Sequence, residues 1–268
     1  MILENKTFEY VLDNGLRVLF NITSGSPSAT FMVWYRVGSR NEMEGQTGIS
    51  HFLEHLSFKR TEFFETGQIV AEITRNGGHF NAYTSRDFTC YYETFATSKL
   101  ELAMIIEAQR MSSMILEESE REKEVGIILS ELEKSLDNPY ISLETDVRYQ
   151  AYLSHPYRFP IIGKKEDIIT IKTQDLLSYY QNYYIPNNAT IVVVGNFDPN
   201  KTLDLIKKYF AGIEPGKIFE TTKKESQQDK TRRISVRKSG STPIIKLAFH
   251  MPSAKDTDIY PLTVLGEM

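Results

Sequence analysis

Cysteine is nearly missing from this sequence, because Cys90 is the only one among 268 residues. A single thiol excludes an internal disulfide and permits a reducing compartment. Long apolar runs are missing as well, since none approaches the roughly 20 residues that a membrane-spanning helix needs. The net charge of −4 argues against a nucleic-acid partner, which binds a basic surface. The opening MILENKTFEY contains neither the basic nor the apolar segment of a signal peptide, so we expect a cytoplasmic protein.

What remains is an ordinary globular composition, with 41% hydrophobic and 25% charged residues. Alternating or β-branched segments predict strands over residues 8–20, 28–37, 79–95 and 188–197. We expect the first of these to be a hairpin, closed at Asn14-Gly15 by a type I′ turn.

Helical periodicity is found between and after these strands. It predicts helices over residues 48–57, 67–78, 98–116, 118–136, 142–152, 173–184 and 200–213. Thr47 is the expected N-cap of the first helix, and Ser98 with Glu101 forms a capping-box pair for the third. Hairpins followed by helical runs indicate an α+β fold, a mostly antiparallel sheet with helices packed on one face.

The polar stretch from residue 214 to 233 has the composition of a linker. We therefore expect residues 1–213 to form one complete α+β domain. Residues 234–268 would begin a second, homologous domain, because they weakly repeat the order strand, polar loop and apolar helix of residues 28–56. The sequence ends as that second helix begins, which predicts a fragment of a longer protein. The alternative is a short tail packed on the first domain.

The stretch GQTGISHFLEHLSFK, from Gly45 to Lys59, holds two of the five histidines in the chain. His51 and His55 lie four residues apart, so a helix directs both imidazoles to one side. Zinc binds neutral imidazole nitrogens, and a catalytic zinc keeps three protein ligands and an open position for water. Glu54 is offset from both histidines and can take a proton from that water.

Two polar residues can also share a solvated helix face without any metal. The other positions of this helix are apolar, namely Ile49, Phe52, Leu53 and Leu56. The imidazoles and the carboxylate are then enclosed rather than solvated, and a metal supplies the partners that enclosed polar groups need. This favours the metal hypothesis.

A third ligand is needed, and the helix over residues 118–136 offers Glu124 and Glu131. They are seven residues apart, so they lie on nearly the same face beside an apolar stripe. Most glutamates in such positions are solvated surface groups. Helix geometry alone therefore leaves both interpretations open.

Several segments together resemble the pitrilysin/insulysin family of inverzincin zinc metallopeptidases, which includes the mitochondrial processing peptidase. They are the H-x-x-E-H motif at residues 51–55, NGGHFNAYTSRDFTCYYE, HPYRFPIIG and YYIPNNATIVVVGNFD. The likeness extends in outline over residues 5–213, and it is to the N-terminal catalytic half of the family.

The resemblance implies one zinc ion per chain, held by His51, His55 and a glutamate about 76 positions after the motif, which is Glu131. It implies two catalytic residues, Glu54 as general base and Glu124 as a support that orients a ligand or shapes the local field. A surface carboxylate remains the alternative for Glu124.

The resemblance also implies a substrate-binding edge strand in GGHFNAYTS, with Asn81 and Ala82 at the matching positions. A peptide can add to such a strand through main-chain hydrogen bonds. The Asn81 amide can then face a substrate carbonyl, and the small Ala82 lets the peptide approach. An ordinary hairpin strand is the alternative.

The expected function is a zinc-dependent endopeptidase that hydrolyses peptides or unfolded segments by metal-activated water. Family members pair two homologous halves, so we expect a homodimer or pairing with a second homologous half or subunit. We expect no nucleic-acid or membrane partner. One alternative is a non-catalytic peptide-binding subunit, or the inactive half of a two-part peptidase. A purely structural metal site is another, but it would want four protein ligands.

Overall fold

The computed structural model describes residues 6–25, 27–219, 223–238 and 242–267. Residues 220–222 of the predicted linker, and residues 239–241 and Met268 of the predicted second domain, lie outside the described residues. Within the described ranges, no helix is both long and apolar enough to cross a membrane.

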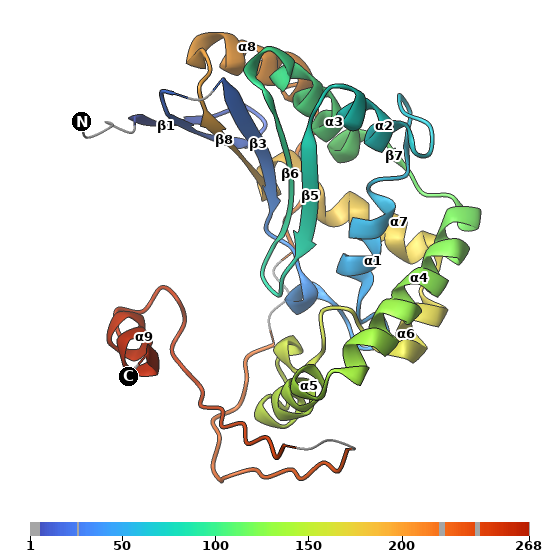
Figure 1. Ribbon diagram of the computed structural model, residues 1–268, viewed down its shortest axis with the longest axis vertical. Helices are drawn as coiled ribbons and strands as arrows, with labels where there is room; N and C mark the ends of the chain where they lie inside the picture. The colour runs from blue at the N-terminus through green and yellow to red at the C-terminus, as the bar shows by residue number, and fades with distance from the viewer. Residues whose placement is uncertain (1–5, 26, 220–222, 239–241, 268) are drawn as a thin grey trace.

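A six-stranded sheet in the order β1-β2-β8-β3-β6-β5 is the centre of the molecule (Figure 1). Its strands are β1 (Lys6–Val11), β2 (Arg17–Ile22), β3 (Ser28–Tyr35), β5 (His79–Thr84), β6 (Thr89–Ala96) and β8 (Ala189–Gly195). Neighbouring strands run antiparallel except β2 and β8, which are parallel. A separate two-residue pair joins β4 (Arg60–Thr61) to β7 (Met114–Ile115). The mostly antiparallel α+β fold predicted from the sequence is confirmed.

The helices lie on one side of this sheet, except the last one, which lies apart from the sheet (Figure 1). They are α1 (Ile49–Leu56), α2 (Gln68–Arg75), α3 (Leu100–Ser112), α4 (Glu118–Asp137), α5 (Pro139–Ala151), α6 (Lys165–Thr170), α7 (Thr173–Tyr183), α8 (Pro199–Phe210) and, near the end of the chain, α9 (Ile259–Glu267). Buried and partly exposed residues alternate within the strands, which explains why helices cover one face of the sheet. Every second residue of β3, from Ala29 to Tyr35, is buried, while the residues between them are only partly covered.

The start of α1 differs from the prediction. The residue before the helix is Gly48, at φ +90°, and the Thr47 hydroxyl does not cap it but donates to Asp167 Oδ2 at 2.5 Å. The buried carboxylate of Glu42 takes the capping role, because it accepts from the backbone N–H groups of Gly48 (2.8 Å) and Ser50 (3.1 Å). Burial raises the pKa of Glu42 to about 7, against the effect of these two N–H donors.

The start of α3 also differs, because no side-chain hydrogen bond caps it and the predicted capping box does not form. Glu101 instead accepts from the Tyr209 hydroxyl (2.6 Å) and the Lys208 ammonium (3.2 Å) on α8. The helix ends at Ser112, since the next residues pair as β7 with β4. Contacts between elements decide both ends of this helix.

The hairpin of β1 and β2 forms as predicted, but its turn is not of type I′. Only glycines have positive φ among the described residues, so Gly15 (φ +82°) adopts it and Asn14 does not. The Asn14 side chain instead bonds to residues at the end of α8, which are distant in the sequence. Its Nδ2 donates to the carbonyl oxygens of Phe210 (2.8 Å) and Ile213 (3.0 Å), where α8 ends.

We expect the Asn14→Ala substitution to lower the free energy of unfolding by about 1–3 kcal/mol, because it leaves carbonyl groups at the end of α8 without their donor. Urea denaturation followed by circular dichroism measures this change. Asn21→Ala is the control, since the Asn21 side chain bonds Thr7 at an exposed position, and its effect should stay within about 0.5 kcal/mol. Equal effects of the two substitutions would contradict a stabilising role of the two Asn14 hydrogen bonds.

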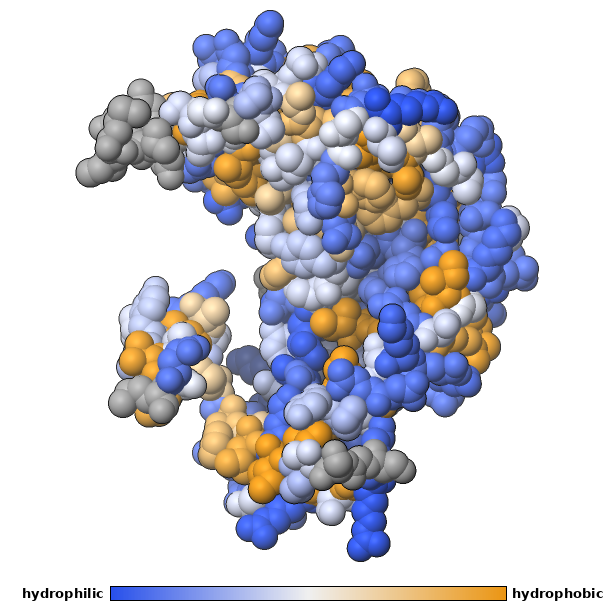
Figure 2. Space-filling model, viewed as in Figure 1, coloured by the Kyte–Doolittle hydropathy of each residue, from blue (hydrophilic) through white to orange (hydrophobic). Residues whose placement is uncertain are grey.

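The described residues 223–238 and 242–250 form neither helix nor strand and make an extended segment beside α5 (Figure 1). Lys246 contacts Glu144 at 2.7 Å, and the Arg232 guanidinium donates to the carbonyl of Gln150 at 2.7 Å. The strand predicted within residues 243–250 is not formed there, because no neighbouring strand pairs with it. Figure 2 shows apolar surface along this segment and over α9. The domain division at residue 213 stays a prediction.

Candidate metal centre

The apolar stripe of α1 faces the core, which fixes the direction of its polar side chains. Ile49, Phe52, Leu53 and Leu56 are almost completely buried, as their spacing predicts. His51 and His55 lie on another side of the helix, where α1 packs against α4. Both imidazoles are partly covered and still reach solvent.

Three donor atoms converge between α1 and α4. The Nε2 atoms of His51 and His55 are 3.3 Å apart, and Glu131 Oε2 is 3.9 Å from the first and 3.6 Å from the second. Zinc bonds of about 2.0–2.1 Å at tetrahedral angles place neighbouring ligand atoms about 3.3 Å apart. The three predicted ligands are therefore brought together, the two histidine nitrogens at that spacing and Glu131 Oε2 0.3–0.6 Å farther from them.

The group is open rather than closed. In the described part of the chain it consists of these three residues, and the Glu131 side chain is 47% exposed. A structural zinc site has four protein ligands, whereas a catalytic one has three and a free position. The three donors have the ligand number of a catalytic zinc site.

Glu124 determines which nitrogen of His55 faces the group. Its Oε1 lies 2.8 Å from His55 Nδ1, and its Oε2 lies 2.8 Å from the Lys59 ammonium. A carboxylate only accepts, so Nδ1 carries the proton and Nε2 presents a lone pair. His51 Nε2 and Glu131 Oε2 lie beside that lone pair, and neutral imidazole and carboxylate are both ligands that zinc accepts. The donor set thus fits a bound divalent metal.

The two histidines differ in their electrostatics. Burial, and secondarily His55, lowers the pKa of His51 to about 4, so the ring is neutral at neutral pH. Burial lowers the pKa of His55 too, but the contact with Glu124 outweighs it and the pKa is raised overall. Burial likewise opposes ionisation of Glu124, yet its bonds to His55 and Lys59 leave its pKa lowered. Glu124 is an ionised partner of the ring.

Glu54 lies on the side of α1 that meets β5. It is 9% exposed, and its Oε2 accepts a hydrogen bond of 2.5 Å from the Thr84 hydroxyl. Burial raises the pKa of Glu54, and the Thr84 bond and the charge of His55 oppose that rise. A carboxyl group with a raised pKa is suited to take up and return a proton.

Asn81 and Ala82 lie on β5, which is an edge strand of the sheet. Ala82 is buried, and the exposed Asn81 accepts from the Ala82 backbone N–H through Oδ1 at 2.9 Å. The open edge is compatible with the addition of a peptide strand. Substrate binding by these two residues stays a prediction.

Sequence reasoning overlooked Thr84 and Lys59. Thr84 follows Ala82 by two residues and therefore shares its face of β5, the face towards α1. Lys59 follows His55 by four residues, one helical turn beyond the motif. Both signals were visible in the sequence, but each becomes specific only when the partner carboxylate is known.

Comparisons with known proteins agree with this geometry. Residues 17–165 match the family model described as insulinase (peptidase family M16), and residues 170–268 match the peptidase M16 inactive domain. The chain is 33% identical over 263 residues to the zinc protease PqqE of Helicobacter pylori, covering 96% of the chain and 59% of that protein. It is 31% identical over 211 residues to the mitochondrial-processing peptidase subunit beta of Caenorhabditis elegans, covering 79% of the chain and 46% of that protein.

A solved structure gives the same result. The crystal structure of a protease from Helicobacter pylori superposes with a TM-score of 0.81 at 34% identity, over 84% of this chain and 55% of that one. The chain therefore spans only about half to three-fifths of the length of these relatives.

Proposed function

Because the chain belongs to the insulinase family, peptidase family M16, we propose that it is a zinc-dependent endopeptidase acting on peptides or unfolded polypeptide segments. The convergence of His51, His55 and Glu131 on one point, with the carboxyl group of Glu54 on the same helix, carries this proposal. The zinc protease name of the Helicobacter pylori relative supports it.

His51, His55 and Glu131 hold the metal in this proposal, and Glu124 keeps the His55 ring in the correct tautomer. When bound, zinc lowers the pKa of water towards about 7 and polarises a carbonyl group. Glu54 takes a proton from the attacking water and returns it to the leaving amine. The Thr84 hydroxyl holds one carboxyl oxygen of Glu54 and thereby orients the other.

The substrate binds in this proposal as an added strand on the open edge of β5, beside Asn81 and Ala82. Main-chain hydrogen bonds then recognise an extended conformation more than particular side chains. A folded protein cannot present such a segment, so peptides and unfolded regions are the expected substrates.

We also propose that a second homologous half, either another chain or a copy of this one, completes the substrate chamber. One relative is named as a subunit, and the chain spans only part of its relatives. Ile245, Leu247 and Phe249 support the proposal, because they are 78–88% exposed on the extended segment.

Removal of the metal tests the proposed activity. We expect a chelator to reduce cleavage of a quenched-fluorescence peptide library at least about a hundredfold, because catalysis would lose its Lewis acid. One equivalent of zinc per chain should restore the activity. Circular dichroism before and after chelation checks that the fold is retained. Cleavage that persists in a chain shown to be metal-free would refute the proposal.

The same assay distinguishes the proposed endopeptidase from the alternative, a non-catalytic peptide-binding subunit. The match of residues 170–268 to an inactive domain is the observation that favours it. Such a subunit would bind zinc and the peptides but leave them uncut, even when mixed with a second homologous half.

A further inference from the structure

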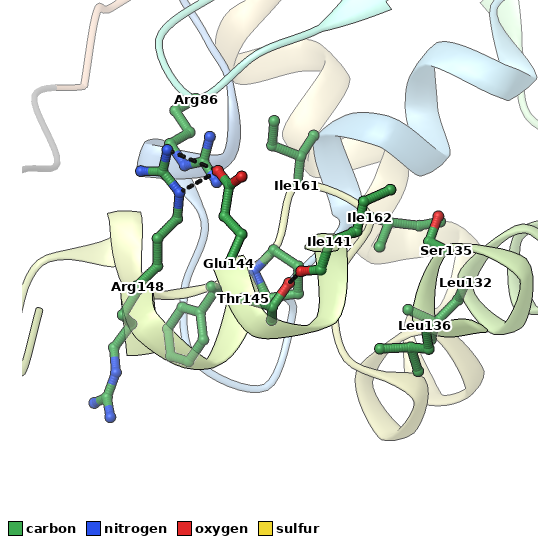
Figure 3. A pocket seen from close by; sticks show the side chains of 13 residues that line it. Arg86, Leu132, Ser135, Leu136, Ile141, Glu144, Thr145, Arg148, Ile161 and Ile162 are labelled. Carbon is green, nitrogen blue, oxygen red and sulfur yellow. Dashed lines mark hydrogen bonds and ion pairs between the residues drawn. The ribbon is translucent and has the colours of Figure 1, made fainter. Parts of the chain in front are cut away.

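A cavity of about 220 Å³, lined by none of the three metal donors, lies between α4, α5 and the segment before α6 (Figure 3). Its two ends differ in character. Arg86, Glu144 and Arg148 group at one end, and the apolar lining is formed by Leu132, Leu136, Ile141, Phe159, Ile161 and Ile162. Arg158 also lines the cavity, but its Nη1 donates to the carbonyl of Leu153 at 2.8 Å.

The polar end has more positive than negative charge. Glu144 accepts from Arg148 through Nε (3.1 Å) and Nη2 (3.0 Å), and its other oxygen lies 2.7 Å from the Lys246 ammonium. Arg86 makes no side-chain hydrogen bond or ion pair within the described residues, and its Nε is buried without a partner. Three cations therefore surround one carboxylate.

The neighbouring acid does not compensate for Arg86. Asp87 accepts from the Arg40 guanidinium (2.9 Å) and from the Tyr157 hydroxyl (2.5 Å). Burial, and secondarily the nearby Arg148, lowers the pKa of Arg86, and the charge of Glu144 only partly opposes that effect. Buried polar groups in folded proteins normally have partners, so an unpaired guanidinium in a cavity wall points to a ligand.

The chemistry of the two ends defines that ligand. A guanidinium presents its N–H groups as a planar fork that matches a carboxylate. The isoleucines and leucines suit an aliphatic body, which gains from removal from water. The volume is below the roughly 300–1,000 Å³ of drug-sized pockets, so the ligand is small.

We infer that this cavity binds a carboxylate attached to a compact aliphatic body, with Arg86 as its main counter-ion. A free amphiphilic carboxylate is one source of this group. The terminal carboxylate of a substrate peptide ending in an aliphatic residue is the other, and only this source rests on the proposed function. The cavity and the metal group share α4, on which Leu132 follows Glu131.

Isothermal titration of the full chain with octanoate, and with neutral octanamide as the matched probe, tests the inference. We expect octanoate to bind at least tenfold more tightly than octanamide. Arg86→Gln should weaken octanoate at least tenfold and leave octanamide unchanged. This variant removes no hydrogen bond or ion pair found in the described chain, and its thermal midpoint verifies the fold. Arg75→Gln, a charge-matched change on exposed α2, should leave both affinities unchanged.

A pair of otherwise identical peptides, ending in leucine with a free or an amidated terminus, distinguishes the two sources. If the ligand is the terminal carboxylate of a substrate, the peptide with the free terminus should have a KM at least tenfold lower than the amidated peptide, and octanoate should compete with it. Arg86→Gln should abolish both the KM difference and the competition. A free ligand predicts octanoate binding with equal cleavage of the two peptides. The inference is overturned if neither octanoate nor the free terminus is preferred over its amide. A chain without peptidase activity still gives the titration result.

Discussion

Glu131→Gln is expected to weaken zinc binding by at least about a hundredfold, the upper range for loss of a residue that only supports a ligand, and to abolish peptidase activity. The amide oxygen carries no charge, so two imidazoles alone would hold the cation. Zinc affinity is measured by competition with a chromophoric chelator. Activity is measured on the quenched-fluorescence peptides.

The fold should survive this change, because the Glu131 side chain is 47% exposed and belongs to no buried network. Glu133→Gln is the matched control. Glu133 is two residues further along α4, 69% exposed, and 3.8 Å from Lys165. It should bind zinc like the original chain. Zinc affinity that is the same in both variants would show that the carboxylate at position 131 is not a ligand.

The parts of this site that arise within one element were predictable from the sequence. The spacing of His51 and His55 follows from the helical period, and the apolar residues between them set which face is buried. In the same way, alternation along β3 predicted a sheet covered on one face. These patterns extend over a few neighbouring residues, so they can be recognised from the sequence alone.

Glu131 shows where local patterns stop being sufficient. Its position on an amphipathic helix was equally compatible with a solvated surface group, and only the family resemblance selected it. The approach of α4 to α1, which brings Glu131 Oε2 to 3.6 Å from His55 Nε2, depends on packing between helices. No periodicity within either helix specifies that approach.

Two of the wrong predictions have a common physical cause. Thr47 was expected to cap its own helix, but it donates to Asp167, 120 residues away. Asn14 was expected to adopt positive φ in a local turn, but its side chain is used at the end of α8, 196 residues away. In both cases a buried hydrogen bond to a distant partner outweighs a local preference of about 1 kcal/mol.

Glu54→Gln is expected to keep zinc bound and to lower kcat/KM by about 10²–10⁴-fold, the usual contribution of a general acid–base group. Glutamine has nearly the same shape and still offers an oxygen to the Thr84 hydroxyl, so the position of the side chain is retained. It cannot take a proton from water at neutral pH. Zinc content and kcat/KM are measured on the same preparation.

Comparison with Glu131→Gln gives this test its resolving power, because the two variants lose activity for different reasons. One loses the metal, and the other keeps it and loses the proton acceptor. Glu44→Gln is the control for a carboxylate near the start of α1, since Glu44 is 73% exposed and lies 3.9 Å from Lys164, and it should cleave normally. Undiminished cleavage by zinc-loaded Glu54→Gln would assign the base to another residue, whereas zinc loss would give position 54 a role in metal binding.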